Sequence, residues 1–510
     1  MNPDEIIQEI EKKLWTINTK SKLTNFGIVE SVTDEIVTVS GLSNVGYYEK
    51  VEFDNGSIGF VLDISEDRVL IILLNTIKNI NCGTKVFSTG KVLDITISNE
   101  IIGRVVDALL QPIDGKPLVH EISSTKHYPI ERYAPGITQR GTVNTPLKTG
   151  IKAIDILIPI GRGQRELLIG DRGTGKTSIA IDTIINQKKI DMGLKKVICI
   201  YCSIGQKKSN LASIVAQLKK FQAMEYTIVV AATASDPVAM QYISPLVACS
   251  IGEYFMDKGE DVLIIYDDLI KHAWSYRQIS LLIKRPAGRE AYPGDIFYLH
   301  SRLLERAAKM SDKNGGGSIT ALPIVETQEN DLSAYIPTNI ISITDGQIYL
   351  EYDLFNLGIR PAINVGLSVS RVGGKAQTKF MKELAGSIRL ELSRFRELQS
   401  FIQFDNELEK ISLQKIERGK RITEILKQSQ YDTYSEALEL LLVFSITNGL
   451  FDNVSIADVI IIEQKLVNFI KTKYPKNLNE LLMSNKTNYN TLKSELEKEL
   501  KDFKATLNTK

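Results

Sequence analysis

The residues with the clearest chemistry form one short loop, Gly170-Asp-Arg-Gly-Thr-Gly-Lys-Thr177, which matches the full G-x-x-x-x-G-K-[ST] pattern of a phosphate-binding loop. Its glycines let the backbone curl so that N–H groups face phosphate oxygens. Lys176 brings a positive charge to the β- and γ-phosphates, and Thr177 offers a hydroxyl ligand to Mg²⁺. The loop follows a predicted strand (residues 166–170) and opens a predicted helix, whose N-terminal dipole also attracts anions. This context predicts a nucleotide site.

A carboxylate is expected near this loop, where it would meet the same metal ion. The apolar residues 261–266 predict a strand, and this strand runs directly into Asp267 and Asp268. In P-loop NTPases an acid at the carboxyl end of such a strand holds Mg²⁺. Because Asp267 follows the strand immediately, Thr177 and Asp267 are the predicted metal ligands.

The residue after the strand that follows the phosphate loop decides whether such a site can hydrolyse its nucleotide. A hydrolytic site needs a carboxylate there to polarise the attacking water. Residues 197–204 predict that strand, and Gln206 occupies the position. An amide can orient a water molecule but is too weakly basic to take its proton. We therefore predict a structural or regulatory site; a water-orienting role for Gln206, as in some GTPases, is the alternative.

The elements that must position these residues fall into about three domains, as a length of 510 residues suggests. Residues 1–24 have apolar side chains at helical spacing and predict an amphipathic helix or arm. Residues 25–93 contain five or six short alternating runs, which predict a small antiparallel β-barrel. Apolar strands alternate with helical segments in residues 94–377, which predicts a mostly parallel α/β sheet. Long helical periods in residues 378–510 predict a C-terminal helical domain.

Charge and composition exclude several classes of protein and partner. The 62 basic and 61 acidic residues nearly cancel, so the chain lacks the basic excess of a nucleic-acid-binding protein. Residues 25–93 hold nine acidic and five basic residues, and a barrel with a net charge of −4 repels a phosphate backbone. No nucleic-acid partner is therefore expected. No apolar stretch approaches the roughly 18 residues of a membrane-spanning helix, so we expect contact with a membrane only through partners.

Four cysteines are too few for a disulfide framework, which favours a reducing compartment. Cys199 and Cys202 form a C-x-x-C motif, but they lie in a predicted strand, where positions i and i+3 point to opposite faces. No second pair at zinc spacing accompanies them in the sequence. We expect neither a metal nor a redox role for this pair.

The phosphate loop is one of many motifs that occur in a fixed order along the chain. The others include Ile158-Pro-Ile-Gly-Arg-Gly-Gln-Arg-Glu166, Arg285-Pro-Ala-Gly-Arg-Glu-Ala-Tyr-Pro-Gly-Asp295, Gly358-Ile-Arg-Pro-Ala-Ile-Asn-Val-Gly366 and Ser368-Val-Ser-Arg-Val-Gly-Gly374. Together they closely resemble the alpha-subunit family of the F-type (H⁺-transporting) ATP synthases. The resemblance is dense from about residue 134 to residue 398, looser in the barrel and weakest after about residue 400.

This resemblance implies a RecA-like fold for the central domain and a place in a ring of three alpha and three beta subunits. It also implies contacts with the gamma subunit of the central stalk and, at the N-terminus, with the delta or peripheral-stalk subunit; the membrane proton channel is reached indirectly. The implied function is synthesis of ATP from ADP and phosphate using a proton gradient, with Mg²⁺ and ATP or ADP at a non-catalytic site of this chain. The implied location is peripheral, on the cytoplasmic face of a bacterial inner membrane, or alternatively inside an organelle that encodes the chain.

The resemblance also assigns roles to single residues. Arg371 matches the arginine of the family that reaches the nucleotide of the neighbouring beta subunit and is required there for catalysis in trans. Gln206 matches the non-catalytic pattern and lies at the bound nucleotide. The other implied contacts are the phosphate-binding residues Gly170, Asp171, Arg172, Gly173, Thr174, Gly175, Lys176, Thr177 and Ser178 and the adenine-pocket residues Arg360, Pro361, Gln428 and Gln430.

Three positions depart from the family pattern. Gly173 stands where a Gln is usual, which removes one side-chain contact to phosphate and predicts a lower affinity. Ala287 replaces a usual Pro. Lys375 stands where a small residue is common, four residues after Arg371, so its charge adds to the local field.

Alternatives from other classes make different predictions. An RNA helicase ring of the transcription-termination type shares the barrel and the RecA-like layout, but it needs a basic, aromatic RNA-binding face, whereas this barrel is acidic. A flagellar or secretion-system export ATPase, like the beta subunit of the synthase, should have a catalytic Glu in place of Gln206. A pure scaffold would not need an intact phosphate loop.

Overall fold

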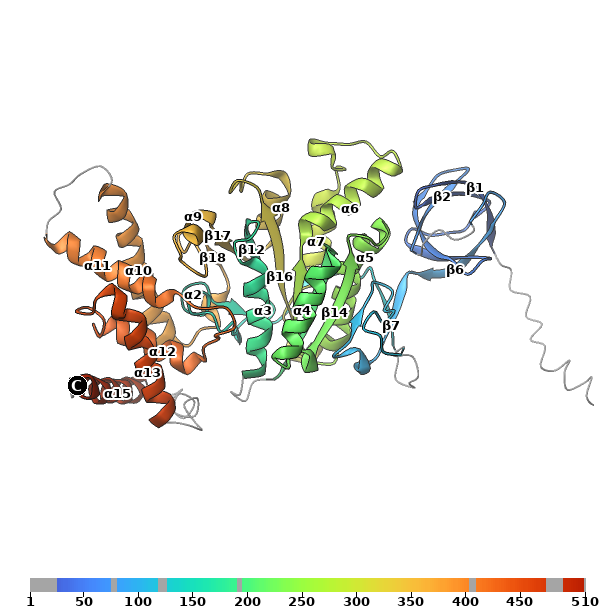
Figure 1. Cartoon of the computed structure of the whole chain (residues 1–510). Helices are drawn as coiled ribbons and strands as arrows, with labels where there is room; N and C mark the ends of the chain where they lie inside the picture. Colours follow the sequence, from blue (N-terminus) through green and yellow to red (C-terminus); the bar gives the residue numbers. More distant parts are fainter. Residues whose placement is uncertain are drawn as a thin grey trace, which may run out of the picture. The chain divides into compact units, whose positions relative to one another are not determined.

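The computed structural model describes residues 25–74, 80–117, 126–189, 195–402, 410–473 and 489–508. The predicted N-terminal helix or arm lies outside these residues. The chain divides into two compact units, the first ending at Leu93 and the second beginning at Asp94. Figure 1 shows the elements of both units.

The first unit contains a closed barrel of six strands that pair in the order β1-β2-β5-β4-β3-β6. Branched side chains such as Val37, Val51 and Ile71 fill its interior. The barrel was predicted with five or six strands; the sixth has the weakest apolar pattern, because it contains Ser, Thr, Gly and Lys. The strands are β1 (Phe26–Thr33), β2 (Ile36–Ser40), β3 (Glu49–Phe53), β4 (Ile58–Ile64), β5 (Val69–Leu73) and β6 (Lys85–Val92).

The second unit is built on an eight-stranded sheet with the order β18-β17-β12-β16-β15-β13-β14-β8. Every neighbouring pair is parallel except β17 and β18, which confirms the predicted mostly parallel sheet. Its strands are β8 (Val105–Val106), β12 (Glu166–Asp171), β13 (Val197–Gln206), β14 (Thr227–Thr233), β15 (Asp261–Asp267), β16 (Ser318–Thr327), β17 (Gly346–Leu350) and β18 (Val369–Ser370). Two smaller ladders pair β7 (Asp94–Ile97) with β9 (Lys126–Pro129) and β10 (Pro146–Leu147) with β11 (Ile160–Gly161).

Helices supply the crossovers that parallel strands require. After β18 the described residues contain helices and no further strand, as predicted. The helices among the strands are α2 (Lys152–Leu157), α3 (Lys176–Asn186), α4 (Lys208–Lys220), α5 (Val238–Met256), α6 (Leu269–Leu282), α7 (Ile296–Leu304), α8 (Tyr335–Ile343) and α9 (Tyr352–Asn356). The C-terminal helices are α10 (Lys379–Ile402), α11 (Lys410–Leu426), α12 (Glu436–Thr447), α13 (Val459–Lys473) and α15 (Tyr489–Asn508).

One hydrophobic core continues from the central sheet into the C-terminal helices. It includes Leu168 of β12, Ile181 of α3, Ile388 of α10 and Leu442 of α12, all of them buried. The apolar stripes of α10 and α12 therefore pack on the nucleotide-binding half of the unit and not only on each other. This packing fixes the C-terminal helices beside the phosphate loop.

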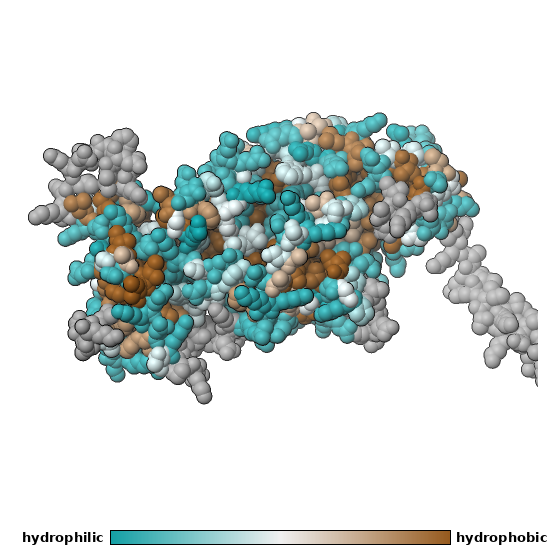
Figure 2. Space-filling model, viewed as in Figure 1, coloured by the Kyte–Doolittle hydropathy of each residue, from teal (hydrophilic) through white to brown (hydrophobic). Residues whose placement is uncertain are grey.

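The surface in view in Figure 2 is mainly hydrophilic, and its hydrophobic patches are interrupted by polar residues. None of the helices in the described part of the chain combines the length and the apolar character needed to cross a membrane.

Two histidines are buried in the second unit. His272 of α6 and His300 of α7 are both fully buried, with ring centres 5.5 Å apart. The ring of His272 also stacks on Tyr242, and its Nε2 lies 3.0 Å from the carbonyl oxygen of that residue. Burial lowers the pKa of His300 to about 4 and puts the pKa of His272 well below its usual value. Both side chains are therefore neutral near pH 7.

The pair predicts acid-sensitive stability. The pKa of His300 is about 4 in the folded chain and about 6.5 in the unfolded chain. Between these pH values the unfolded chain binds more protons. The free energy of unfolding therefore falls by about 3 kcal/mol as the pH drops through this window. We expect His300→Gln to flatten the dependence of the unfolding midpoint on pH between about 6.5 and 4. His127→Gln, at an exposed histidine, is the control; equal slopes for the two variants would contradict the prediction.

Candidate nucleotide-binding site

The phosphate loop connects the end of β12 to the start of α3. Gly170 lies so close to β17 that a Cβ atom there would come within 2.2 Å of the carbonyl oxygen of Leu350, which explains the glycine. Gly175, directly before α3, has a φ of 102°, a left-handed conformation that glycine adopts without strain. Apart from Gly175 itself and its two chain neighbours, no atom of the described residues lies within 4 Å of the point where its Cβ would be. The space beside the loop is therefore open to a ligand.

Lys176 is buried and already oriented by the loop. Its Nζ donates to the carbonyl oxygens of Gly170 (2.7 Å) and Asp171 (2.6 Å). These two bonds leave one of the three ammonium N–H groups for a phosphate oxygen. Burial lowers the pKa of Lys176, while the neighbouring carboxylates oppose this shift. The loop thus holds a cation in place for an anionic ligand.

Three donors converge on the carboxylate of Asp267 at the end of β15. Thr177 Oγ1 and the Tyr201 hydroxyl donate to its Oδ2 at 2.9 and 2.6 Å, and Gln206 Nε2 donates to its Oδ1 at 3.0 Å. Asp268 instead caps α6 by accepting from the backbone N–H of Lys271 at 2.8 Å. Mg²⁺ prefers oxygen ligands and usually binds one or two carboxylates together with phosphate oxygens and waters. The adjacent oxygens of Thr177 and Asp267 fit this ion.

Other loop residues support the loop or line the space beside it. The carboxylate of Asp171 accepts from Thr327 Oγ1 at 2.6 Å and from the backbone N–H of Asn330 at 3.0 Å, so it ties the loop to the end of β16. Arg172 and Gly173 are exposed, whereas Thr174 is buried and donates to the carbonyl oxygen of Asp171 at 2.8 Å. The predicted phosphate contacts that line the adjoining cavity are Gly173, Thr174, Gly175 and Ser178.

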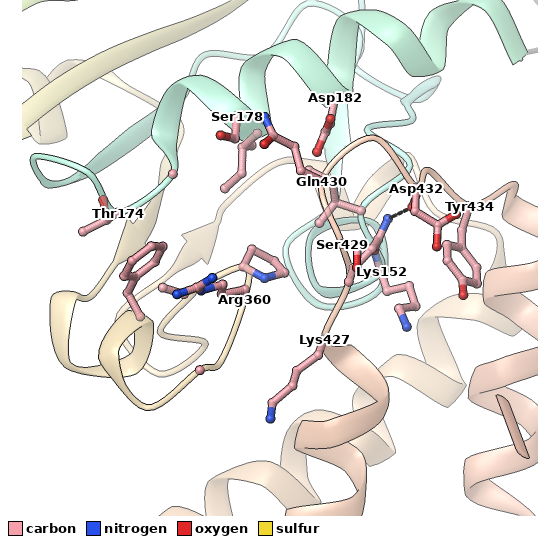
Figure 3. A pocket seen from close by; sticks show the side chains of 18 of the residues that line it. Lys152, Thr174, Ser178, Asp182, Arg360, Lys427, Ser429, Gln430, Asp432 and Tyr434 are labelled. Atoms are coloured by element: carbon pink, nitrogen blue, oxygen red, sulfur yellow. Dashed lines mark hydrogen bonds between the residues drawn. The ribbon is translucent and has the colours of Figure 1, made fainter. Parts of the chain in front are cut away.

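A cavity of about 620 Å³ adjoins the loop. Figure 3 shows the side chains of residues that line it. This volume lies within the range of roughly 300–1,000 Å³ that small-molecule sites occupy. Five segments line it: the loop with α3, the start of α2, α9 with the turn after it, the connection between α11 and α12, and the start of α13. All four residues predicted for the adenine pocket line this cavity: Arg360, Pro361, Gln428 and Gln430.

The two glutamines of this wall have different environments. Gln428 joins three segments: its Oε1 accepts from the backbone N–H of Lys152 at 2.9 Å, and its Nε2 donates to the carbonyl oxygens of Gly150 (2.7 Å) and Asp432 (2.5 Å). Its amide is therefore committed to holding the wall together. Gln430 is exposed, and its side chain makes no hydrogen bond with the described residues. Gln430 is thus the residue of the two with donors and acceptors available to a ligand.

Several cavity residues were not found from the sequence. At the far end from the loop, Lys152 Nζ bonds Glu463 Oε1 at 2.6 Å, and the hydroxyl of Tyr434 donates to the same oxygen at 3.1 Å. Asp182 of α3 accepts from the backbone N–H of Tyr431 at 3.0 Å. Asp182 could have been noticed in the sequence as an acidic residue within a largely apolar helical run. The ion pair has no sequence signal, because its partners are 311 residues apart.

Comparisons with known proteins identify the family of this chain. Sequence models of three protein families match it: "ATP synthase alpha/beta family, beta-barrel domain" over residues 24–90, "ATP synthase alpha/beta family, nucleotide-binding domain" over residues 150–370, and "ATP synthase alpha/beta chain, C terminal domain" over residues 377–503. The chain belongs to the ATP synthase alpha/beta family.

Individual members of this family are similar over the full length. ATP synthase subunit alpha of Dehalococcoides mccartyi (strain CBDB1) is 51% identical over 504 residues, which cover 99% of this chain and 98% of the relative. The protein of the same name from Rickettsia bellii (strain OSU 85-389) is 52% identical over 510 residues, or 99% of each chain. ATP synthase subunit alpha 1 of Nitrosospira multiformis is 50% identical over 516 residues, or 99% of each chain. The resemblance predicted from the motifs is thereby confirmed.

In this ATP synthase alpha/beta chain, Arg371 lies away from the cavity. It follows β18 at the edge of the sheet, and its backbone N–H donates to the carbonyl oxygen of Asp345 at 3.0 Å. Its side chain is exposed and forms no hydrogen bond or ion pair with any described residue. The cavity residues and Arg371 therefore form two separate features of one chain.

Proposed function

We propose that the chain is the alpha subunit of an ATP synthase, which binds Mg-ATP or Mg-ADP without turning it over and supplies Arg371 to the catalytic site of a neighbouring beta subunit. One observation carries the proposal. Gln206 ends β13, where a hydrolytic site needs a free carboxylate, and its amide donates to Asp267. The names of the relatives, ATP synthase subunit alpha or alpha 1, favour the same assignment.

The geometry suggests how the chain's own groups would hold a nucleotide. Lys176 would donate its remaining N–H to the terminal phosphates, and the backbone N–H groups at the start of α3 would donate to the others. Thr177 and Asp267 would ligate Mg²⁺, which neutralises phosphate charge when it is bound. The cavity beyond Ser178 would enclose adenine, with Gln430 offering both a donor and an acceptor.

The absence of turnover would follow from the bases present. The attacking water must lose a proton to a group near the γ-phosphate. Gln206 has no basic atom for this task, and its Nε2 is engaged by Asp267. Asp267 itself receives three donors and faces the metal position. A nucleotide bound here would therefore remain intact.

A single-turnover measurement tests this proposal. The isolated chain, loaded with one equivalent of Mg-ATP and quenched over time, should retain ATP with no burst of ADP. Rapid hydrolysis would mean that Gln206 orients water productively, and the non-catalytic assignment would be lost.

The partners and the division of the chain belong to the same proposal. We place the chain in a ring of three alpha and three beta subunits, in contact with the gamma subunit and, through residues 1–24, with the delta or peripheral-stalk subunit. Residues 25–93, 94–377 and 378–510 would form its barrel, nucleotide-binding and helical domains. The ring would lie peripherally on the cytoplasmic face of a bacterial membrane, above a proton channel. Purification of the native complex should reveal a companion chain with a phosphate loop and a catalytic Glu; a homohexamer would overturn the assignment.

Position 173 offers a prediction about affinity. Gly173 has a φ of 82°, so any side chain costs about 1 kcal/mol of strain there, yet the described residues leave open space around it. Gly173→Gln should restore a hydrogen bond to phosphate, worth about 1.5–3 kcal/mol for a charged partner, and bind Mg-nucleotide more tightly than the parent. Gly173→Ala has the same strain without the contact and should bind Mg-nucleotide more weakly than Gly173→Gln. Equal affinities for the two variants in calorimetric titrations would contradict the prediction.

A further inference from the structure

A buried polar network lies beneath the strand that precedes Arg371. Gln164 and Glu166 are fully buried. The Oε1 atom of Gln164 accepts from the backbone N–H of Gly161 at 2.9 Å, and its Nε2 donates both to Glu166 Oε2 at 2.7 Å and to Ser370 Oγ at 3.0 Å. Each polar atom of the Gln164 amide is therefore used, and the amide has one orientation.

The network fixes the residue next to Arg371 from several sides. Ser370 Oγ donates to the carbonyl oxygen of Pro159 at 2.6 Å and accepts from the backbone N–H of Gly373 at 3.2 Å. The backbone of Ser370 pairs with Gly346 of β17. Because Ser370 is held through both side chain and backbone, the point at which the Arg371 side chain leaves the sheet edge is set by these contacts.

Glu166 is the costly member of the network. Its Oε1 has no hydrogen-bond partner among the described residues, and burial raises its pKa well above the usual value, while the positive charge of Arg371 lowers it. A Cβ atom at Gly346 would lie 2.6 Å from Glu166 Oε2 and 2.1 Å from the carbonyl oxygen of Val369. Glycine at that position makes room for the carboxyl group beneath β18. Burying a polar group lowers the stability of the fold unless the group is hydrogen-bonded. Stability therefore does not explain why a glutamate occupies this position.

We propose that Gln164 and Glu166 are positioning residues for Arg371. Glu166 accepts one N–H of the Gln164 amide, which directs the other N–H of that amide toward Ser370. Ser370 in turn sets the position of Arg371. Neither residue lines the nucleotide cavity. This inference rests on the proposed role of Arg371 in the neighbouring subunit, where a misplacement of about 1 Å can reduce a rate about 100-fold.

Two substitutions of Glu166 separate positioning from folding. Glu166→Leu fills the same space without an acceptor; since apolar residues often replace buried ionisable groups at little cost in stability, the chain should fold, and the freed amide of Gln164 should no longer hold Ser370. We expect kcat of the reconstituted complex to fall about tenfold or more. KM for the nucleotide at the beta-subunit site, and the affinity of this chain's own site, should not change. Glu166→Gln keeps an acceptor oxygen and should restore kcat to near the parent value.

The control is Glu439→Leu, which removes another fully buried glutamate, on α12, and should leave kcat unchanged. Unchanged kcat in Glu166→Leu, or an equal loss in Glu166→Gln, would overturn the proposal. So would a loss of kcat accompanied by an equal loss of own-site affinity, because that indicates general misfolding. Arg371→Lys is measured alongside: if it leaves turnover intact, the proposed function fails, whereas a loss in Arg371→Lys without a loss in Glu166→Leu removes only the positioning role.

Discussion

Replacing Arg371 with Lys is expected to reduce turnover of the assembled complex by about 10³- to 10⁵-fold, the range observed for arginine fingers. Lys keeps the positive charge but loses the planar fork that contacts two phosphate oxygens at once. In the isolated chain the side chain is exposed and unbonded to the described residues, so its replacement should cost little in folding. Nucleotide occupancy of the chain's own cavity should therefore stay the same.

Two measurements distinguish this effect from damage to the ring. Sedimentation measures whether the complex assembles, and nucleotide content after desalting measures whether the chain's own cavity is filled. Both are compared with the steady-state turnover. Arg394→Lys, at an exposed arginine of α10, is the matched control and should behave as the parent does. Turnover of Arg371→Lys within about twofold of the parent would remove the arginine from the catalytic site of the neighbour.

Lys176→Gln should weaken binding of Mg-nucleotide to the isolated chain by about 10- to 100-fold, since a hydrogen bond to a charged group contributes about 1.5–3 kcal/mol. Burial already lowers the pKa of Lys176. The charge of Lys176 therefore adds little to the stability of the fold when no nucleotide is bound. A glutamine amide can still donate to the carbonyl oxygen of Gly170. The unfolding midpoint without ligand should therefore change little, while the increase that Mg-ATP produces should largely disappear.

Lys219→Gln, at an exposed lysine near the end of α4, is the control for the loss of one positive charge. Thermal shifts at several Mg-ATP concentrations measure both effects together, because a ligand that binds only the folded state stabilises it in proportion to the logarithm of its concentration. Equal ligand-induced shifts in Lys176→Gln and the parent would contradict a phosphate role for Lys176.

The elements that could be predicted are those with several turns or alternations of their own. Strands β12, β13 and β15 lie within two residues of the predicted positions, because each is a continuous apolar run between helical segments. In contrast, β8, β17 and β18 have five residues or fewer. A period cannot be recognised over so short a length, and these strands form because a neighbour such as β12 offers a free edge.

The two halves of the site differ in the same way. The phosphate loop is contiguous in sequence, and its glycines are dictated by backbone geometry, so the roles of Lys176 and Thr177 could be predicted from the residues alone. The part of the cavity proposed to hold adenine is assembled from segments near residues 150, 360, 430 and 460. Their side chains follow no common spacing, and only the family resemblance pointed to Arg360, which lines the cavity. Lys152 and Glu463 were not found at all, because only the folded chain brings them together.

The unbroken core between the central sheet and the C-terminal helices has a kinetic consequence. Leu426 and Leu438 flank the connection that forms one wall of the cavity, and both belong to this core. Moving that wall away from α3 would expose such side chains, at about 1.5–3 kcal/mol for each one fully uncovered. A nucleotide held behind it would leave only during rare openings, so its residence time would be governed by hydrophobic packing on the helical side as well as by phosphate affinity. Long retention is the behaviour expected of a nucleotide that is kept and not consumed.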